Sequence, residues 1–335
     1  MLTFLKRANA FIAFVLAVTL FGAAPAPGFR VTLLGTGTPE PNIARFSAST
    51  LVEVGGKRFV FDFGRGVTMR LWQLKVPLGS IDAGFLTHFH SDHLVGLPDL
   101  WLTGWLRPAY GGRNTPFVLY GPPGIKALTD HLSAAFAEDI ATRMADEHDP
   151  AAGIAFETHE IVPGLAYDRD GIKIYAFAND HGALVKPSYG YKVVYGGRVF
   201  VLAGDTRYSP AVVAQAKGAD LFVHPVTFIP DALLVAQPAF RAVYNHLASP
   251  EDAAKAFLLA APKMAALSHI GLNGGSTEEQ LVARIRQTYN GPLTVGHDLT
   301  TFDIGETVTV TSPVSPESYT TGAHCSRRCR SSAAR

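Results

Sequence analysis

The chain has 335 residues, with 29 Lys and Arg against 28 Asp and Glu, and apolar residues make up 47% of it. The formal net charge of +1 gives no overall attraction to nucleic acid or to anionic membranes, and the apolar content excludes a largely disordered protein. Both cysteines, Cys325 and Cys329, lie close to the C-terminus, which excludes a disulfide framework, a cysteine-ligated metal site and a catalytic thiol in the body of the chain.

The N-terminus has the pattern of a secretory signal peptide. Lys6 and Arg7 precede an uncharged apolar run over residues 10–24, and a Pro-Ala-Pro sequence follows. This run is shorter than the roughly 20 apolar residues that span a bilayer. We therefore predict a cleaved signal peptide at residues 1–26, a periplasmic or secreted mature protein, and no membrane attachment after cleavage.

Apolar runs rich in β-branched and aromatic residues predict the strands that follow. "STLVEV" and "KRFVFDF" are joined by Gly55 and Gly56, a pair that favours a two-residue hairpin turn. Beyond a histidine-rich segment, residues 94–171 are long and mixed, and we predict an insertion or a lid there.

In the second half, further strand-like runs alternate with helices, and two of these helices are predicted to begin at the capping residues Ser249 and Ser276. This order predicts two sheet layers flanked by helices in one domain over residues 27–311. The Ser, Thr, Pro and Arg content of residues 312–335 predicts a disordered tail.

The motif that decides the chemistry is "THFHSDH", residues 87–93, at the end of an apolar strand-like run. His88 and His90 are two residues apart, so their imidazoles project from the same face at the end of a strand, and Asp92 and His93 follow in a turn. Three imidazoles and a carboxylate within six residues suit zinc better than calcium or soft metals. The alternative is a cluster of surface histidines, and the preceding apolar strand argues against it.

With this motif, the sequence resembles the metallo-β-lactamase-fold superfamily of metal-dependent hydrolases, whose signature is the same His-x-His-x-Asp-His run. "LLGTGTPEPN", "FVFDFGRG" and "VLAGDT" occur in the order typical of the ribonuclease Z and arylsulfatase-like branch. The resemblance covers nearly all of residues 29–311. It implies an α+β fold, a four-layer αββα sandwich in a single domain, with two Zn²⁺ ions per chain, although Mn or Fe would also fit.

The same resemblance implies which residues form the site. By that match the metal ligands are His88, His90, Asp92, His93, His181, Asp205 and His269. Asp205 would bridge the two ions, which can share a hydroxide that attacks an ester. Asp92 would also orient or deprotonate this nucleophile. His246 resembles the histidine of the ribonuclease Z "HST" motif, which donates a proton to the leaving group, so Asp92 and His246 are the candidate catalytic residues.

Two departures from ribonuclease Z affect the expected substrate. Pro225 replaces the glutamate of its "HEATF" motif, which pairs with the catalytic histidine, so the acidic partner of the ribonuclease Z proton relay is missing here. Only 23 residues separate His181 from Asp205, which leaves no room for the arm that binds tRNA.

We therefore predict an exported dinuclear zinc hydrolase of a small anionic ester, with arylsulfatase-like or phosphodiesterase-like activity, and nucleic acid is disfavoured as a partner. A ribonuclease Z-like endoribonuclease and a lactonase are the alternative hydrolases. Outside the hydrolases, the alternatives are a metal-free binding protein and a diiron redox centre. Dimers are frequent in the branch that the sequence resembles, so a homodimer is a further expectation.

Overall fold

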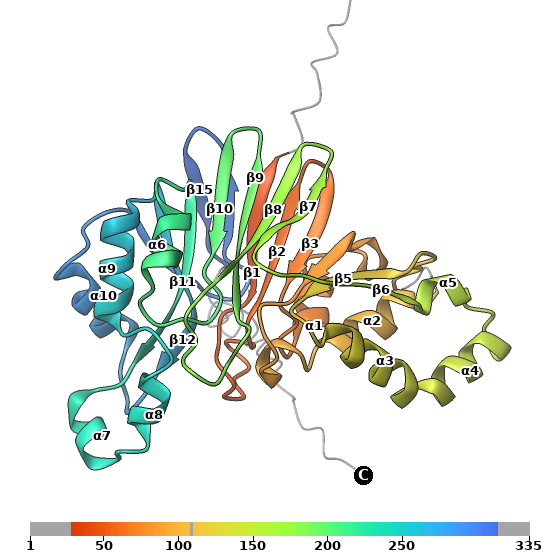
Figure 1. The fold of residues 1–335 in the computed structure, drawn as a ribbon, viewed down its shortest axis with the longest axis horizontal. Helices are drawn as coiled ribbons and strands as arrows, with labels where there is room; N and C mark the ends of the chain where they lie inside the picture. Colours follow the sequence, from red (N-terminus) through yellow and green to blue (C-terminus); the bar gives the residue numbers. More distant parts are fainter. Residues whose placement is uncertain (1–27, 108–109, 314–335) are drawn as a thin grey trace, which may run out of the picture.

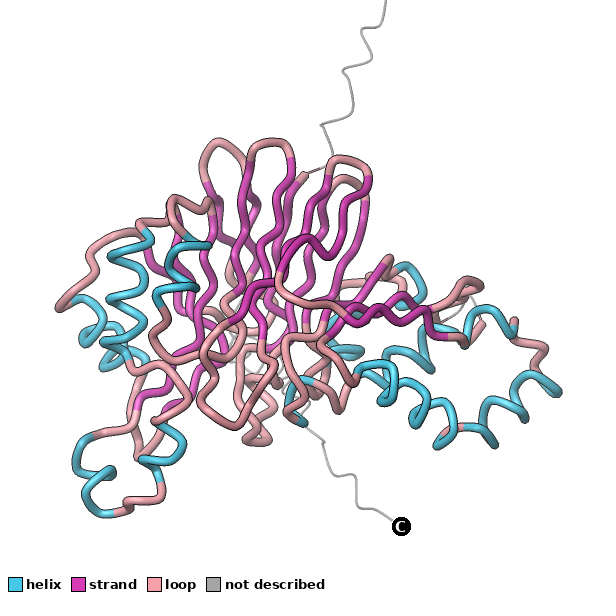
Figure 2. The backbone as a smooth tube through the Cα atoms, in the orientation of Figure 1, coloured by secondary structure: helices cyan, strands magenta, loops and turns pink. Residues whose placement is uncertain are grey.

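The computed structural model describes residues 28–107 and 110–313. Two β-sheets lie face to face, and helices cover the outer face of each sheet (Figures 1 and 2). This is the predicted αββα sandwich in a single domain. The predicted signal peptide, and all of the predicted tail beyond residue 313, lie outside the described residues.

The first sheet has eight strands in the order β15-β14-β1-β2-β3-β4-β5-β6. Its predicted hairpin is confirmed, since β2 and β3 are joined at Gly55 and Gly56, whose positive φ angles of 57° and 79° suit glycine. The strands are β1 (Phe29–Gly35), β2 (Ser49–Val54), β3 (Lys57–Phe61), β4 (Ala83–Phe85), β5 (Phe117–Gly121), β6 (Phe156–Glu160), β14 (Thr301–Ile304) and β15 (Val308–Thr311).

The second sheet has seven strands in the order β13-β12-β11-β10-β9-β8-β7. A two-glycine turn at Gly196 and Gly197 joins β9 directly to β10, so no further element is inserted between them. The strands are β7 (Gly164–Arg169), β8 (Ile172–Ala178), β9 (Tyr189–Tyr195), β10 (Arg198–Leu202), β11 (Leu221–Phe228), β12 (Met264–Leu272) and β13 (Leu293–Val295).

Three apolar layers separate the four structural layers. The layer between the two sheets buries Phe59, Phe85 and Tyr191. The layer between the first sheet and its helices buries Trp101, and the layer between the second sheet and its helices buries Phe257. Among the described residues, no helix is both long enough and apolar enough to cross a membrane. The α-helices are α1 (Val67–Gln73), α2 (Leu97–Trp105), α3 (Ile125–Ala135), α4 (Ala137–Asp146), α5 (Ala151–Ile154), α6 (Pro210–Ala216), α7 (Asp231–Ala236), α8 (Phe240–Tyr244), α9 (Pro250–Ala260) and α10 (Glu278–Arg286).

Residues 94–171, expected to be an insertion or a lid, belong largely to the sandwich itself. β5 and β6 extend the first sheet, β7 borders the second sheet, and α2 buries both of its tryptophans. Only the region of α3 and α4 extends away from the sheets, at the lower right of Figure 1. The sequence alone does not show that these strands join the two sheets, because pairing at a sheet edge depends on partners that are distant in sequence.

Helix caps agree with the sequence at one of the two predicted positions. Ser249 forms the predicted capping box with Asp252 at the start of α9. At α10 the cap is Thr277, which pairs with Gln280, and not Ser276. The Ser276 hydroxyl donates instead to the carbonyl of Asn273 at 2.6 Å, so it does not cap the helix.

A buried carboxylate holds the loop that follows β1. Asp298 accepts hydrogen bonds from the backbone N–H groups of Thr36 at 2.9 Å and Phe46 at 2.8 Å, and from the Arg70 guanidinium at 2.9 Å. Asp298 thereby fixes both ends of residues 36–46, part of which lines the candidate site.

We expect Asp298→Ala to lower the free energy of unfolding by about 3–5 kcal/mol, because it leaves a largely buried arginine and two backbone donors without their acceptor. Denaturant unfolding measures this loss. The control is Asp303→Ala, which breaks an exposed ion pair with Arg30 and should cost about 1 kcal/mol or less. Equal losses in the two variants would contradict the assignment.

Candidate metal centre

The predicted metal ligands come from loops at one edge of the sandwich and from one strand. His88 and His90 follow β4, and Asp92 and His93 lie in a 3₁₀ turn immediately after them. His181 follows β8, and Asp205 follows β10. Loops at strand ends are common positions for functional groups held on a rigid scaffold.

His269 reaches the same edge from within β12 by a β-bulge. The pairing of β11 with β12 passes from Pro225–Ser268 to Val226–Ile270, so His269 has no partner in the register. Its φ of 46° is left-handed, an unusual conformation outside glycine. A bulge re-aims a side chain, and here it turns the imidazole toward the other ligands.

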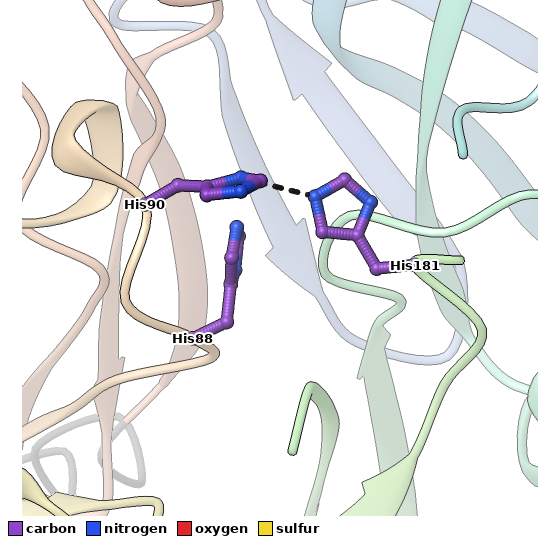
Figure 3. Close-up of side chains that lie close together, drawn as sticks. All are labelled: His88, His90 and His181. Carbon is purple, nitrogen blue, oxygen red and sulfur yellow. Dashed lines mark hydrogen bonds between the residues drawn. The ribbon is translucent and has the colours of Figure 1, made fainter. Parts of the chain in front are cut away.

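Three imidazoles form the first group of ligand atoms. The rings of His88, His90 and His181 point toward one another (Figure 3), and one nitrogen of each lies within 4.8 Å of the others. Nδ1 of His90 is 3.1 Å from Nε2 of His181. Nδ1 of His181 is 2.9 Å from the carbonyl oxygen of His246, which directs Nε2 of His181 into the group.

Asp92, His93 and His269 form the second group. Nε2 of His269 is 3.2 Å from Oδ2 of Asp92. Asp205 lies between the two groups, because its Oδ2 is 3.1 Å from Nε2 of His269, 3.5 Å from Nε2 of His93 and 3.7 Å from Nε2 of His181. One carboxylate oxygen can therefore reach cations held by either group.

Asp62 lies behind the histidine segment and fixes its position. It accepts hydrogen bonds from the backbone N–H of Thr87 at 2.8 Å and from Nδ1 of His93 at 2.7 Å. The Thr87 hydroxyl contacts both Asp62 and Nδ1 of His88. These contacts orient the Nε2 atoms of His88 and His93 into the site, as partners of metal-binding histidines commonly do.

The chemistry of this cluster fits cations. Nε2 of His88 and Nε2 of His93 are buried without a hydrogen-bond partner among the residues that the structure describes. Burial keeps the pKa of His88 well below its usual value, so its imidazole is neutral, as ligation requires. Burial would raise the pKa of Asp205, but His269 and His93 hold it well below its usual value. Five imidazoles and two carboxylates are compatible with a dinuclear metal site.

A cavity of about 240 Å³ opens beside the cluster. No Lys or Arg of the described residues lines it. Its lining combines candidate ligands, one further carboxylate, several apolar side chains and a few uncharged polar ones: Thr38, Pro39, Glu40, His90, Asp92, His181, Asp205, Thr227, Val243, His246, Leu247, His269, Gly271, Leu272 and Asn273.

His246 lies in this lining, with its ring centroid 5.3 Å from that of His181. Within the described parts of the chain, no carboxylate bonds its ring, in agreement with Pro225 at the family's glutamate position. Sequence analysis did not single out Thr38 or Asn273. The only available signal was that each lies at or just beyond the C-terminal end of a strand.

Comparison with known proteins now identifies the family. The family model described as "Anti-Pycsar protein Apyc1" matches residues 29–253. Ribonuclease Z of Mycobacterium bovis is 34% identical over 271 residues, which cover 81% of this chain and 96% of that protein. The chain belongs to the ribonuclease Z and Apyc1 branch of the metallo-β-lactamase superfamily. It is therefore a metal-dependent hydrolase, as the sequence predicted.

Solved structures agree with this membership. The short form of human tRNase Z is 25% identical, with a TM-score of 0.60 over 82% of this chain and 99% of that one. The metallo-β-lactamase-fold protein YhfI of Bacillus subtilis, at 15% identity, has a TM-score of 0.63 over 82% of this chain and 99% of its own. YhfI thus shares the fold with this member of the ribonuclease Z branch.

Proposed function

We propose that the protein is a phosphodiesterase that works with two metal ions, with zinc as the first choice. The observation that carries the proposal is the position of Asp205, whose Oδ2 lies within 3.7 Å of nitrogens from both ligand groups. The ribonuclease Z relatives, of which the Mycobacterium bovis protein is aligned over 96% of its length, support a phosphodiester as the bond that is cleaved. Because these relatives are named ribonuclease Z, they favour the endoribonuclease alternative over the arylsulfatase-like activity that the sequence analysis predicts.

In this proposal His88, His90 and His181 would hold one ion and Asp92, His93 and His269 would hold the other. Asp205, which lies between the two groups, would contribute its carboxylate to both. When bound, two such ions activate water and neutralise charge at the phosphoryl group.

Two side chains of the protein, Asp92 and His246, would position the water and protonate the leaving group. Asp92 accepts a hydrogen bond from the attacking water and orients it toward the phosphorus. His246, also in the cavity lining, donates a proton to the oxygen of the leaving group. Because Pro225 supplies no carboxylate, the imidazole of His246 acts without an acidic partner.

The ribonuclease Z relatives make RNA a plausible substrate, against the sequence-based expectation that disfavoured nucleic acid. A precursor tRNA is therefore the first substrate to test. A small diester is the second candidate, and two observations favour it. The cavity lining has no Lys or Arg among the described residues. A two-glycine turn joins β9 directly to β10, so no RNA-binding arm is inserted between these two strands.

A substrate panel tests this proposal on the metal-loaded protein. It contains precursor tRNA, bis(4-nitrophenyl) phosphate, 4-nitrophenyl phosphate, 4-nitrophenyl sulfate and a lactone. We expect the two diester substrates to have the highest kcat/KM. Faster hydrolysis of the sulfate or of the lactone would contradict a phosphodiesterase, and a coloured iron protein without hydrolysis would favour the redox alternative.

We also propose export and dimer formation. Export is supported by the apolar run after Lys6 and Arg7. Fractionation of the source cells should place the processed protein outside the cytoplasm, and full-length protein in the cytoplasm would contradict export.

For the proposed dimer, sedimentation velocity should give the mass of two chains. A single-chain mass would contradict the dimer.

A further inference from the structure

We propose that the cavity beside the metal centre selects diesters whose leaving group is apolar and carries no further negative charge. Val243 and Leu272 contact that group, and Glu40 repels a leaving group that carries an additional anionic group. This inference rests on the proposed phosphodiesterase function and narrows its substrate class. It separates small diesters from RNA, in which further phosphates flank the cleaved bond.

The leaving group would lie in this cavity because the candidate proton donor does. His246 lines the cavity, and a proton donor must reach the oxygen of the group that departs. The cavity has a volume of about 240 Å³, which is less than the usual volume of sites for drug-sized ligands. It therefore suits a small organic group.

Four apolar side chains form part of the cavity lining: Pro39, Val243, Leu247 and Leu272. The backbone N–H of His246 donates to the carbonyl of Val243 at 3.3 Å, so Val243 lies one turn before the candidate proton donor. Leu272 ends β12, and Pro39 lies in the loop after β1. Because Val243 is 38% exposed and Leu272 is partly exposed, a bound group can cover both and remove apolar surface from water.

Glu40 is the only carboxylate of the described lining that is not a candidate metal ligand. It is exposed, and it also lines a smaller neighbouring cavity that contains Arg45. Within the described parts of the chain Glu40 forms no ion pair, and Arg45 is engaged with Glu278 and with the carbonyl of Gly296. The negative charge of Glu40 therefore repels an anionic group held in the cavity.

Outside the metal centre, no cationic side chain offsets this charge in the described lining. Neither Lys nor Arg of the described residues lines the cavity, and Arg207, which follows Asp205 closely, is paired with Asp180 at 2.8 Å. A leaving group with its own phosphate or carboxylate would thus meet a like charge and no compensating one. Apolar contacts and a like charge together give selection for one class of substrate and against another.

Three methyl aryl phosphates whose leaving phenols have similar acidity test the proposal. Their leaving groups are phenol, 4-butylphenol and 4-(2-carboxyethyl)phenol, and liquid chromatography measures the phenol that the metal-loaded protein releases. We expect kcat/KM of the butylphenyl ester to exceed that of the phenyl ester about threefold or more, because more apolar surface is buried. It should exceed that of the carboxyethyl ester about tenfold or more, because the carboxylate is also repelled.

Val243→Ser removes part of the apolar lining at an exposed position. The preference for the butylphenyl ester over the phenyl ester should fall about twofold or more. Val235→Ser is the matched control, because Val235 is 75% exposed on the neighbouring helix α7 and does not line the cavity. An unchanged preference in Val243→Ser, or an equal fall in the control, would overturn the apolar contact.

Glu40→Gln removes the charge and keeps the shape of the side chain. The kcat/KM of the carboxyethyl ester relative to the butylphenyl ester should rise about threefold or more, and added salt should reduce this rise. Glu138→Gln is the matched control, because Glu138 is exposed on α4 and does not line the cavity. No rise in Glu40→Gln, or an equal rise in both variants, would overturn the repulsion.

Binding of phosphonates provides a measurement that does not depend on turnover. Calorimetry on the metal-loaded wild type should give a Kd for 4-butylphenylphosphonate several-fold lower than that for 4-(2-carboxyethyl)phenylphosphonate. If the wild type cleaves no diester, the proposed function fails, and this comparison still decides the selectivity. Equal binding of the two phosphonates, including no binding of either, would overturn the proposal. Faster cleavage of precursor tRNA than of the butylphenyl ester would also overturn it, while the phosphodiesterase function would stand.

Discussion

Replacement of Asp205 by alanine should remove at least one metal ion per chain and lower kcat/KM for a diester by about a thousandfold or more. The reason is geometric, because Oδ2 of Asp205 is the only described carboxylate oxygen within 3.7 Å of nitrogens from His269, His93 and His181 together. Without it, both groups lose the carboxylate that lies between them. Metal content by mass spectrometry and steady-state kinetics measure the two effects.

Asp220→Ala is the control for this variant. Asp220 is also buried and accepts a hydrogen bond from Lys263, but it lies just before β11, at the opposite end of the strands from the metal centre. This variant should lose stability and keep its metals. An Asp205→Ala protein with wild-type metal content and wild-type rate would contradict the assignment of the site.

Replacement of His246 by alanine should have a different signature. We expect full metal content and a fall in kcat of about 10²–10⁴-fold, the usual contribution of a general acid. The metals should remain because Nδ1 of His181 contacts the backbone carbonyl of His246, which alanine retains. The loss should be larger for substrates with poor leaving groups, since these depend most on a proton donor.

His131→Ala is the matched control, because His131 is an exposed histidine on α3 and does not line the cavity. This variant should keep the wild-type rate. A rate loss in His246→Ala that is the same for all leaving groups would argue against proton donation, and a loss of metal would indicate a structural role.

The candidate site was largely predictable because its ligands carry a sequence signal. His88, His90, Asp92 and His93 are contiguous, and the structure brings His181 and Asp205 to them from the ends of β8 and β10. The order of strand-like and helical runs was also enough to predict the four layers. These features are local in the sequence or follow from the general packing of sheets and helices.

Other features depend on tertiary contacts and could not be predicted. The helical segment that starts at Ile125 is broken at Phe136 into α3 and α4. The bulge at His269 depends on the register of β12 against β11.

Metal stoichiometry measured together with activity tests the central claim most directly. The protein is stripped with a chelator and titrated with Zn²⁺ while bound metal and diester hydrolysis are recorded. The account predicts that the stripped protein is inactive and that activity is restored as binding approaches two ions per chain. Full activity after chelation would contradict it. Activity restored without metal bound to the seven candidate ligands (His88, His90, Asp92, His93, His181, Asp205 and His269) would also contradict it.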